Sequence, residues 1–206
     1  TQRLIQVAED SMYRHKLLEG KSARNSILAS LEASLHEKDI ETKEHALRLV
    51  KTTAKVGERL GLNPNEMDDL NLFARLHDIG KITVDESIIN KQGKLTADEF
   101  KEIKKHSETG YRIAQSSQIL SNIAEYILAH HERWDGKGYP HGLKGEEIPL
   151  LSRILAIADA FDAMTNDRPY RKAMNHSSAV DELKTHSGRQ FDPKLVPLFI
   201  ETIKDI

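Results

Sequence analysis

The 206-residue sequence contains no cysteine, so disulfides, thiolate nucleophiles and cysteine-ligated zinc sites are excluded. No run of residues approaches the roughly 20 apolar residues that a membrane-spanning helix needs. Residues 1–20 also lack the apolar segment of a secretory signal peptide. These absences favour a protein of the reducing cytoplasm without a membrane span in this chain.

The chain also lacks an excess of charge of either sign. It has 30 basic and 32 acidic residues, a formal net charge of -2. Such a balance provides no general field that would hold long nucleic acids or an anionic membrane surface. An anionic ligand must therefore be bound by a local cluster of side chains. The length suits one main domain.

Helix-start signals occur at two places in the sequence. Asn63 precedes a proline and is followed three residues later by Glu66, and Thr96 is followed in the same way by Glu99. This spacing is that of a capping box, in which the two side chains satisfy each other's backbone N–H groups. We expect the first of these helices to run to about His77.

The fold class follows from the remaining patterns. Residues 149–165 are apolar on nearly all sides, which is typical of a buried central helix. Alternating strand patterns are scarce, and residues 136–148, rich in glycine and proline, are the one long loop. We therefore predict an all-α bundle without internal repeats.

Asp159 lies within the apolar segment 149–165, where an unpaired carboxylate would cost several kcal/mol. Arg153 is too far along the helix to be an obvious partner, and Asp162 adds a second negative charge. A buried salt bridge or a helix cap is the purely structural interpretation of Asp159. A metal ion is the simpler partner for its charge.

Two adjacent histidines continue an apolar stripe. His130 follows Leu120, Ile123 and Ile127 at helical spacing, and His131 comes four residues after the last of these. A single histidine on an apolar face is usually a hydrogen-bonded core residue. Two in succession, in a chain that also buries an acid, favour metal ligation.

The segment HDIGK supplies a second cluster at the end of a helix. His77 and Asp78 offer a nitrogen and an oxygen ligand, and the aspartate can bridge two cations while Lys81 faces an anion. His106 follows a basic stretch, and we expect it to open another helix. For His106 alone, a capping or surface role is the simpler interpretation.

A further pair precedes these clusters. Leu47, Val50 and Ala54 lie at helical spacing, and Glu41 and His45 are four residues apart on the same expected helix, hence on one face. Such pairs are typical of helical metal sites. The alternative for Glu41 is a solvated first-turn acid that stabilises the helix dipole.

Taken in order, these residues resemble the ligands of the HD superfamily of metal-dependent phosphohydrolases. The segment HHERWDGKGYP, residues 130–140, resembles the signature of HD-GYP domains, the cyclic di-GMP phosphodiesterases. The match runs from about Leu35 to the C-terminus and includes HDIGK, RILAIADAFDAMT and DRPYRKA. The implied fold is an HD-type helical bundle with a GYP-containing loop.

The resemblance implies two metal ions that share one aspartate. The implied ligands are His45, His77, Asp78 and Asp159 for one ion, and Asp78, His106, His130 and His131 for the other. Imidazole and carboxylate ligands without sulfur suit iron, our first choice, or manganese or nickel. Glu41 matches family members with three metals, so two and three ions both stay open.

The resemblance also implies substrate contacts. Lys81 would contact a phosphate oxygen, Arg168 and Arg171 would hold phosphates, and Tyr139 would lie on a loop near the base or a partner. The implied reaction is hydrolysis of cyclic di-GMP to pGpG, and on to GMP where a third metal is present. Asp78 and Lys81 would be the catalytic residues.

Two other functions compete with this one. The first is hydrolysis of another cyclic dinucleotide or of a nucleoside phosphate on the same fold. The second is a non-catalytic sensor of dinucleotides, which the intact ligand set disfavours. A homodimer is compatible with either.

Residues 1–24 differ from the rest of the chain. They resemble the closing helix and tail of a GGDEF (diguanylate cyclase) domain, and a linker helix is an equal alternative. We therefore divide the chain into this segment and a phosphodiesterase domain of residues 25–206. The expected partners are cyclic di-GMP and an upstream regulatory or GGDEF-like domain.

Overall fold

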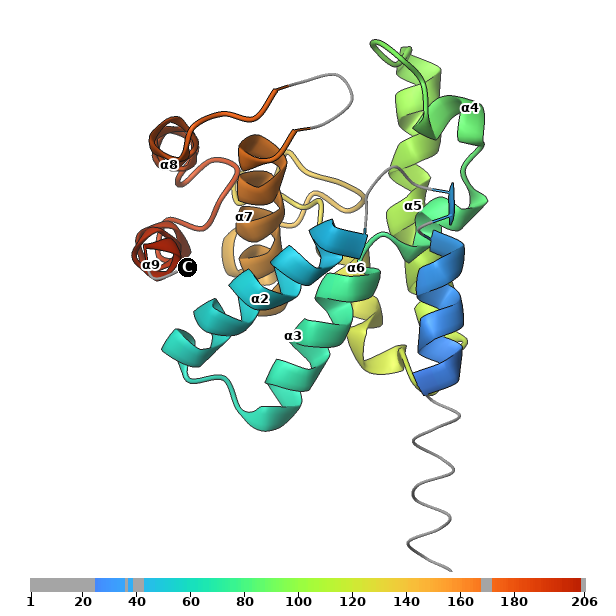
Figure 1. Ribbon diagram of the computed structural model, residues 1–206, viewed down its shortest axis with the longest axis horizontal. Coiled ribbons are helices and arrows are strands. Elements are labelled where there is room, and N and C mark those ends of the chain that lie inside the picture. Colours follow the sequence, from blue (N-terminus) through green and yellow to red (C-terminus); the bar gives the residue numbers. More distant parts are fainter. Residues whose placement is uncertain (1–24, 36, 39–42, 168–171, 205–206) are drawn as a thin grey trace, which may run out of the picture.

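The computed structural model describes residues 25–35, 37–38, 43–167 and 172–204 (Figure 1). The predictions for residues 1–24, Glu41, Arg168 and Arg171 concern positions outside these ranges. Within them, every regular element is an α-helix or a short 3-10 helix, and the only extended pairings are two isolated bridges. The all-α prediction is confirmed.

A helical segment, residues 25–35, precedes the labelled elements. The elements that follow are α2 (Lys43–Leu60), α3 (Pro64–Leu76), η1 (Ile79–Thr83), α4 (Glu86–Ile89), α5 (Ala97–Gln115), η2 (Ser121–Ile123), α6 (Ala124–Ala129), η3 (Gly145–Glu147), α7 (Leu150–Thr165), α8 (His176–Thr185) and α9 (Leu195–Ile203).

Both predicted capping boxes are present. The Asn63 side chain accepts a hydrogen bond from the Glu66 backbone at 3.1 Å, and the Glu66 carboxylate accepts one from the Asn63 backbone at 2.9 Å. Thr96 and Glu99 exchange the same pair of bonds at the start of α5. These caps satisfy N–H groups that have no partner inside the helix, and so they fix where α3 and α5 begin.

Helix α7 lies within the bundle and is covered on several sides. Figure 1 shows α8 and α9 at one end of the molecule and α4 and α5 at the other, with α2, α3 and α7 between them. Helix α2 packs against α3, α7 and α9, while α5 packs against η1 and α6. Six apolar residues of α7 are buried: Leu151, Ile154, Leu155, Ile157, Ala158 and Phe161. The prediction of a buried central helix is confirmed.

Two local details concern the faces of α2 and the start of α5. Leu47 is 58% exposed, because the buried face of α2 contains His45, Leu49 and Thr53 and so mixes polar with apolar residues. The expectation that His106 opens a helix is wrong. It lies in the middle of α5, since the capping box at Thr96 starts that helix earlier and the basic stretch continues it.

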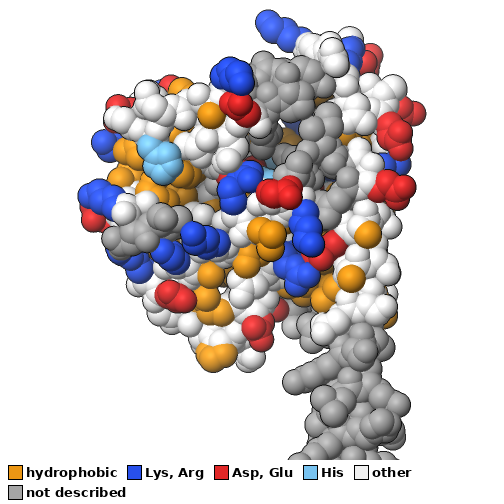
Figure 2. Space-filling model, in the orientation of Figure 1, with side chains coloured by type: hydrophobic (Ala, Val, Ile, Leu, Met, Phe, Trp, Pro, Cys, Tyr) orange, Lys and Arg blue, Asp and Glu red, His pale blue; other side chains and the backbone are white. Residues whose placement is uncertain are grey.

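The surface carries both signs of charge. On the face shown in Figure 2, Lys and Arg side chains are interspersed with Asp and Glu. None of the helices in the described part of the chain is long and apolar enough to cross a membrane.

Candidate metal centre

The residues expected to bind metal, apart from Glu41, are brought to one place by five helices. His45 comes from the side of α2 and Asp159 from the side of α7, while His106 comes from α5. The remaining four follow helix ends: His77 and Asp78 at the end of α3, and His130 and His131 at the end of α6.

The first ligand group contains Asp78, His106, His130 and His131, whose candidate ligand atoms all lie within 4.8 Å of one another. Nε2 of His106 is 3.2 Å from Oδ1 of Asp78 and 3.2 Å from Nε2 of His130. Three imidazoles and one carboxylate thus face a common point.

The second ligand group contains His45, His77 and Asp159, again within 4.8 Å. Nε2 of His45 is 3.6 Å from Oδ1 of Asp159. Nε2 of His77 is 3.1 Å from Oδ2 of Asp78, the carboxylate whose other oxygen faces the first group. Asp78 therefore lies between the two groups, one oxygen toward each.

A hydrogen bond at Nδ1 orients three of the histidine rings. Nδ1 of His77, His106 and His130 donates to the carbonyl three residues earlier, at 3.2, 2.6 and 2.5 Å. A proton held at Nδ1 leaves the lone pair on Nε2, directed away from the helix backbone. This tautomer suits metal binding.

The electrostatics of the two groups fit cations. Burial lowers the pKa of His130, and burial lowers that of His131 well below its usual value, so both rings are neutral ligands at neutral pH. Burial raises the pKa of Asp78, but Lys81, His77 and the neighbouring imidazoles outweigh this and hold it well below its usual range.

Asp159 differs from the sequence-based expectation in one respect. Its side chain is 31% exposed and not fully buried, because it lines a pocket. Its Oδ1 atom is nevertheless buried, with no hydrogen-bond partner among the described residues. An anionic oxygen in that state is costly without a cation, so the donor set fits divalent metal ions.

Lys81 lies beside the carboxylate of Asp78. Its Nζ lies 2.9 Å from Oδ2 of Asp78, and its side chain is 17% exposed. The ammonium group is thus at the edge of the centre, paired with the carboxylate between the two ligand groups. Its expected contact with a phosphate stays a prediction.

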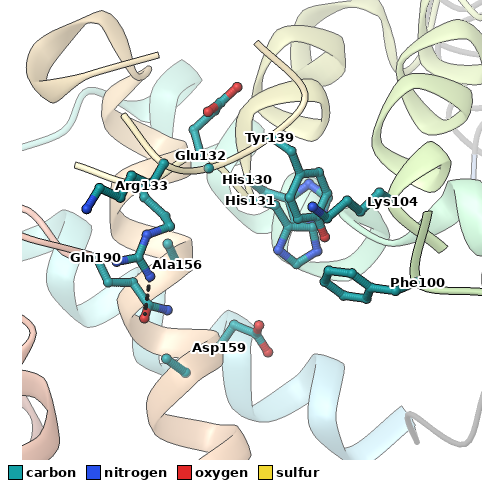
Figure 3. Close-up of a pocket in the computed structure, with 13 residues that line it drawn as sticks. Phe100, Lys104, His130, His131, Glu132, Arg133, Tyr139, Ala156, Asp159 and Gln190 are labelled. Atoms are coloured by element: carbon teal, nitrogen blue, oxygen red, sulfur yellow. Dashed lines mark hydrogen bonds between the residues drawn. The ribbon is translucent and has the colours of Figure 1, made fainter. Parts of the chain in front are cut away.

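A pocket of about 440 Å³ opens beside the histidines (Figure 3). The Tyr139 ring stacks on His131 with centroids 4.8 Å apart, and Nζ of Lys104 lies 4.9 Å from the Tyr139 ring and 4.7 Å from that of Phe100. Burial raises the pKa of Tyr139, so its phenol stays protonated. The sequence pattern did not reveal Phe100 and Lys104, whose only signal there is their spacing of four residues, which places them on one face of α5.

The wall across the pocket is polar. Figure 3 shows Arg133 and Gln190 there, with Nη1 of Arg133 donating to Oε1 of Gln190 at 3.1 Å. Ala156 and Asp159 of α7 lie between the two walls. The pocket therefore offers an aromatic and cationic side and a hydrogen-bonding side.

Glu132 holds the loop that carries Tyr139. It is only 4% exposed, and its Oε1 accepts hydrogen bonds from the backbone N–H groups of His141 and Gly142 at 2.7 and 3.0 Å. Gly138 approaches the chain so closely that a Cβ there would lie 2.5 Å from the Cα of Glu132. Glu132 lies within the segment HHERWDGKGYP, but nothing in the sequence alone indicates this role.

Comparisons with known proteins place the chain in a family. A cyclic di-GMP phosphodiesterase of Thermotoga maritima is 39% identical over 182 residues, which cover 87% of this chain and 50% of the relative. A 3'3'-cGAMP-specific phosphodiesterase of Vibrio cholerae is 37% identical over 183 residues, covering 88% of this chain and 35% of the relative. The chain thus spans half or less of these relatives' lengths.

The fold is also found in a solved structure. The crystal structure of a cyclic GMP-AMP specific phosphodiesterase of V. cholerae matches with a TM-score of 0.68 at 24% identity, covering 87% of this chain and 48% of that one. The HD domain family model matches residues 27–195. The resemblance found in the sequence is confirmed at this level, and the chain belongs to the HD domain family.

Proposed function

We propose that this chain is a metal-dependent phosphodiesterase that hydrolyses a 3',5'-phosphodiester bond of cyclic di-GMP. The observation that carries the proposal is the position of Asp78, whose two oxygens face two separate ligand groups beside a lysine and an open pocket. A shared carboxylate between two cation sites is the arrangement used for in-line displacement at phosphorus.

Each ligand group would hold one divalent ion through the residues given above, with Asp78 common to both. When bound, the ions supply Lewis-acid stabilisation of phosphoryl charge and activation of water at neutral pH. The neutral imidazoles of His130 and His131 need lose no proton to serve as ligands.

The chain's own residues would hold and orient the substrate. Lys81 can move its ammonium from Asp78 to a phosphate oxygen and stabilise charge there. Phe100, Lys104 and Tyr139 form a wall suited to the face of a purine base. Arg168 and Arg171, outside the described residues, complete the proposal as phosphate contacts.

The metal and the final product belong to the same proposal. Nitrogen and oxygen ligands without sulfur favour iron, with manganese or nickel as alternatives. Glu41 would add a third ion, and the enlarged site would then carry the linear product pGpG on to GMP. A cytoplasmic location, an upstream GGDEF-like or other regulatory domain and a homodimer are further parts of the proposal.

A second candidate substrate is a mixed cyclic dinucleotide, 3'3'-cGAMP. The relatives named for the two activities are 39% and 37% identical to this chain, so sequence similarity does not separate them. The two substrates differ in one purine, and the pocket wall formed by Arg133 and Gln190 offers hydrogen-bonding groups that can distinguish guanine from adenine.

The test is hydrolysis by the purified, metal-loaded protein. Cyclic di-GMP, 3'3'-cGAMP, cyclic di-AMP and a simple nucleoside monophosphate are supplied separately, and products are separated by chromatography. We expect the highest kcat/KM with cyclic di-GMP and none after treatment with a chelator. Preference for 3'3'-cGAMP would select the second candidate, and binding without turnover would favour the sensor.

A further inference from the structure

A carboxylate lies behind one of the candidate metal ligands. Nδ1 of His45 donates to Oδ2 of Asp162 at 2.7 Å, while Nε2 on the other side of the ring faces Asp159 at 3.6 Å. Asp159 and Asp162 are one turn apart on α7, so that helix contacts both nitrogens of a ring carried by α2. From the sequence, Asp162 was only an extra negative charge.

Asp162 is itself held on both oxygens. Arg48 approaches it through Nε at 2.5 Å from Oδ1 and through Nη2 at 2.9 Å from Oδ2, and Asn166 donates to Oδ1 at 3.0 Å. His45 and Arg48 are three residues apart on one face of α2. The Asp162 side chain is 9% exposed, against 40% for Arg48, which reaches a second pocket of about 330 Å³. Hydrogen bonds from α2 and from the end of α7 therefore hold the Asp162 carboxylate in one orientation.

His45 differs from three other candidate ligands in the hydrogen-bond partner of its Nδ1 atom. His77, His106 and His130 direct Nδ1 to backbone carbonyls of their own helices, whereas His45 uses a side chain 117 residues away. A carboxylate partner keeps the proton on Nδ1 and makes Nε2 more basic, which strengthens a metal bond at Nε2. It also fixes the ring orientation.

We propose that Asp162, held by Arg48 and Asn166, is a positioning residue that strengthens metal binding at the group of His45, His77 and Asp159 and leaves the other group unaffected. The proposal rests on the metal centre of the proposed function. Loss of such an outer partner typically weakens metal binding about 10- to 100-fold.

The test uses Mn²⁺ alone, titrated calorimetrically into metal-free protein. The parent should show one strong binding event for each of the two ligand groups, assigned by the variants His45→Ala and His130→Ala, each of which should lose a different one. In Asp162→Asn the event lost in His45→Ala should weaken about 10- to 100-fold, and the other should keep its affinity. In the His45→Ala background, Asp162→Asn should change nothing further.

Asp192→Asn is the matched control. Asp192 is 2% exposed and pairs with Arg153 at 2.6 Å. Arg153 lies on α7, nine residues before Asp162, which is roughly 13 Å along the helix. This variant should lower the melting temperature without changing either Mn²⁺ affinity. Arg48→Lys, at a more exposed position, keeps the charge but loses the two-pronged contact, and should weaken the same event as Asp162→Asn by a smaller factor.

The outcomes separate the two proposals. If His45→Ala keeps both events, the metal centre itself is wrong. If His45→Ala loses one event while Asp162→Asn binds both ions as tightly as the parent, only the positioning role is refuted. Equal weakening of both events in Asp162→Asn, or the same weakening in Asp192→Asn, would also refute it.

Discussion

The imidazole of His131 lies against the phenol ring of Tyr139, with centroids 4.8 Å apart and planes inclined by 29°. This contact joins a candidate metal ligand to the wall of the pocket. Any movement of the loop that carries Tyr139 therefore changes both the surroundings of the metal centre and the space for a base.

Glu132 is expected to control that loop. Glu132→Ala removes the acceptor of two backbone N–H groups, those of His141 and Gly142, and a hydrogen bond to a charged group contributes about 1.5–3 kcal/mol. Urea unfolding should report this loss, and KM for the substrate should rise. His141→Ala is the control, because its backbone N–H stays bonded, and it should change neither. Unaltered stability and KM in Glu132→Ala would contradict the role.

Removal of Asp78 should abolish hydrolysis, because its two oxygens serve both ligand groups. Turnover by Asp78→Ala is measured beside its metal content and circular dichroism. We expect loss of activity and of bound metal with the helical spectrum retained. Activity close to that of the parent would refute the shared carboxylate.

Lys81 should act on the substrate and not on the metal. Lys81→Ala removes a cation from the edge of the centre, so kcat/KM should fall by roughly tenfold to a thousandfold while elemental analysis finds the metal retained. A metal loss as large as that in Asp78→Ala would reassign this residue to the structure of the centre.

Glu41 tests whether the site holds two or three ions. We expect up to three metals per chain in the parent, reconstituted anaerobically with iron, and one fewer in Glu41→Ala. The alternative, a solvated first-turn acid, changes the stability by roughly 0.3–1 kcal/mol and leaves the metal count unaltered. Equal counts in both proteins would remove Glu41 from the ligands.

The metal-free protein should lose stability as the pH falls below about 6.5. Burial holds the pKa of His131 well below its usual value, so the unfolded chain takes up a proton that the folded chain refuses. Each such group contributes a slope of up to about 1.4 kcal/mol per pH unit. The free energy of unfolding between pH 7.5 and 5.5 measures this slope.

His131→Gln should reduce that slope, because glutamine does not titrate. The matched control is His186→Gln, at a histidine that caps the C-terminus of α8 and whose side chain is 40% exposed. This control should keep the slope of the parent. An identical slope in His131→Gln and the parent would show that the buried ring is not the source of the pH dependence.

The sequence by itself determined the helical class and the residue types of the centre. Capping boxes at Asn63 and Thr96 and the apolar segment 149–165 are local signals, and local hydrogen bonding and periodicity are sufficient to produce them. Adjacent histidines and a carboxylate in an apolar helix likewise indicated metal binding, because few other partners make a buried acid tolerable.

Only the tertiary structure decided how these residues meet. Periodicity tells which face of a helix a residue occupies but not which distant helix that face will contact. The pairing of Asp162 with His45, the two directions of the Asp78 oxygens and the wall of Phe100 and Lys104 all arise from packing between helices. His45 and Asp162 are 117 residues apart, and their 2.7 Å contact exists because α2 packs against α7.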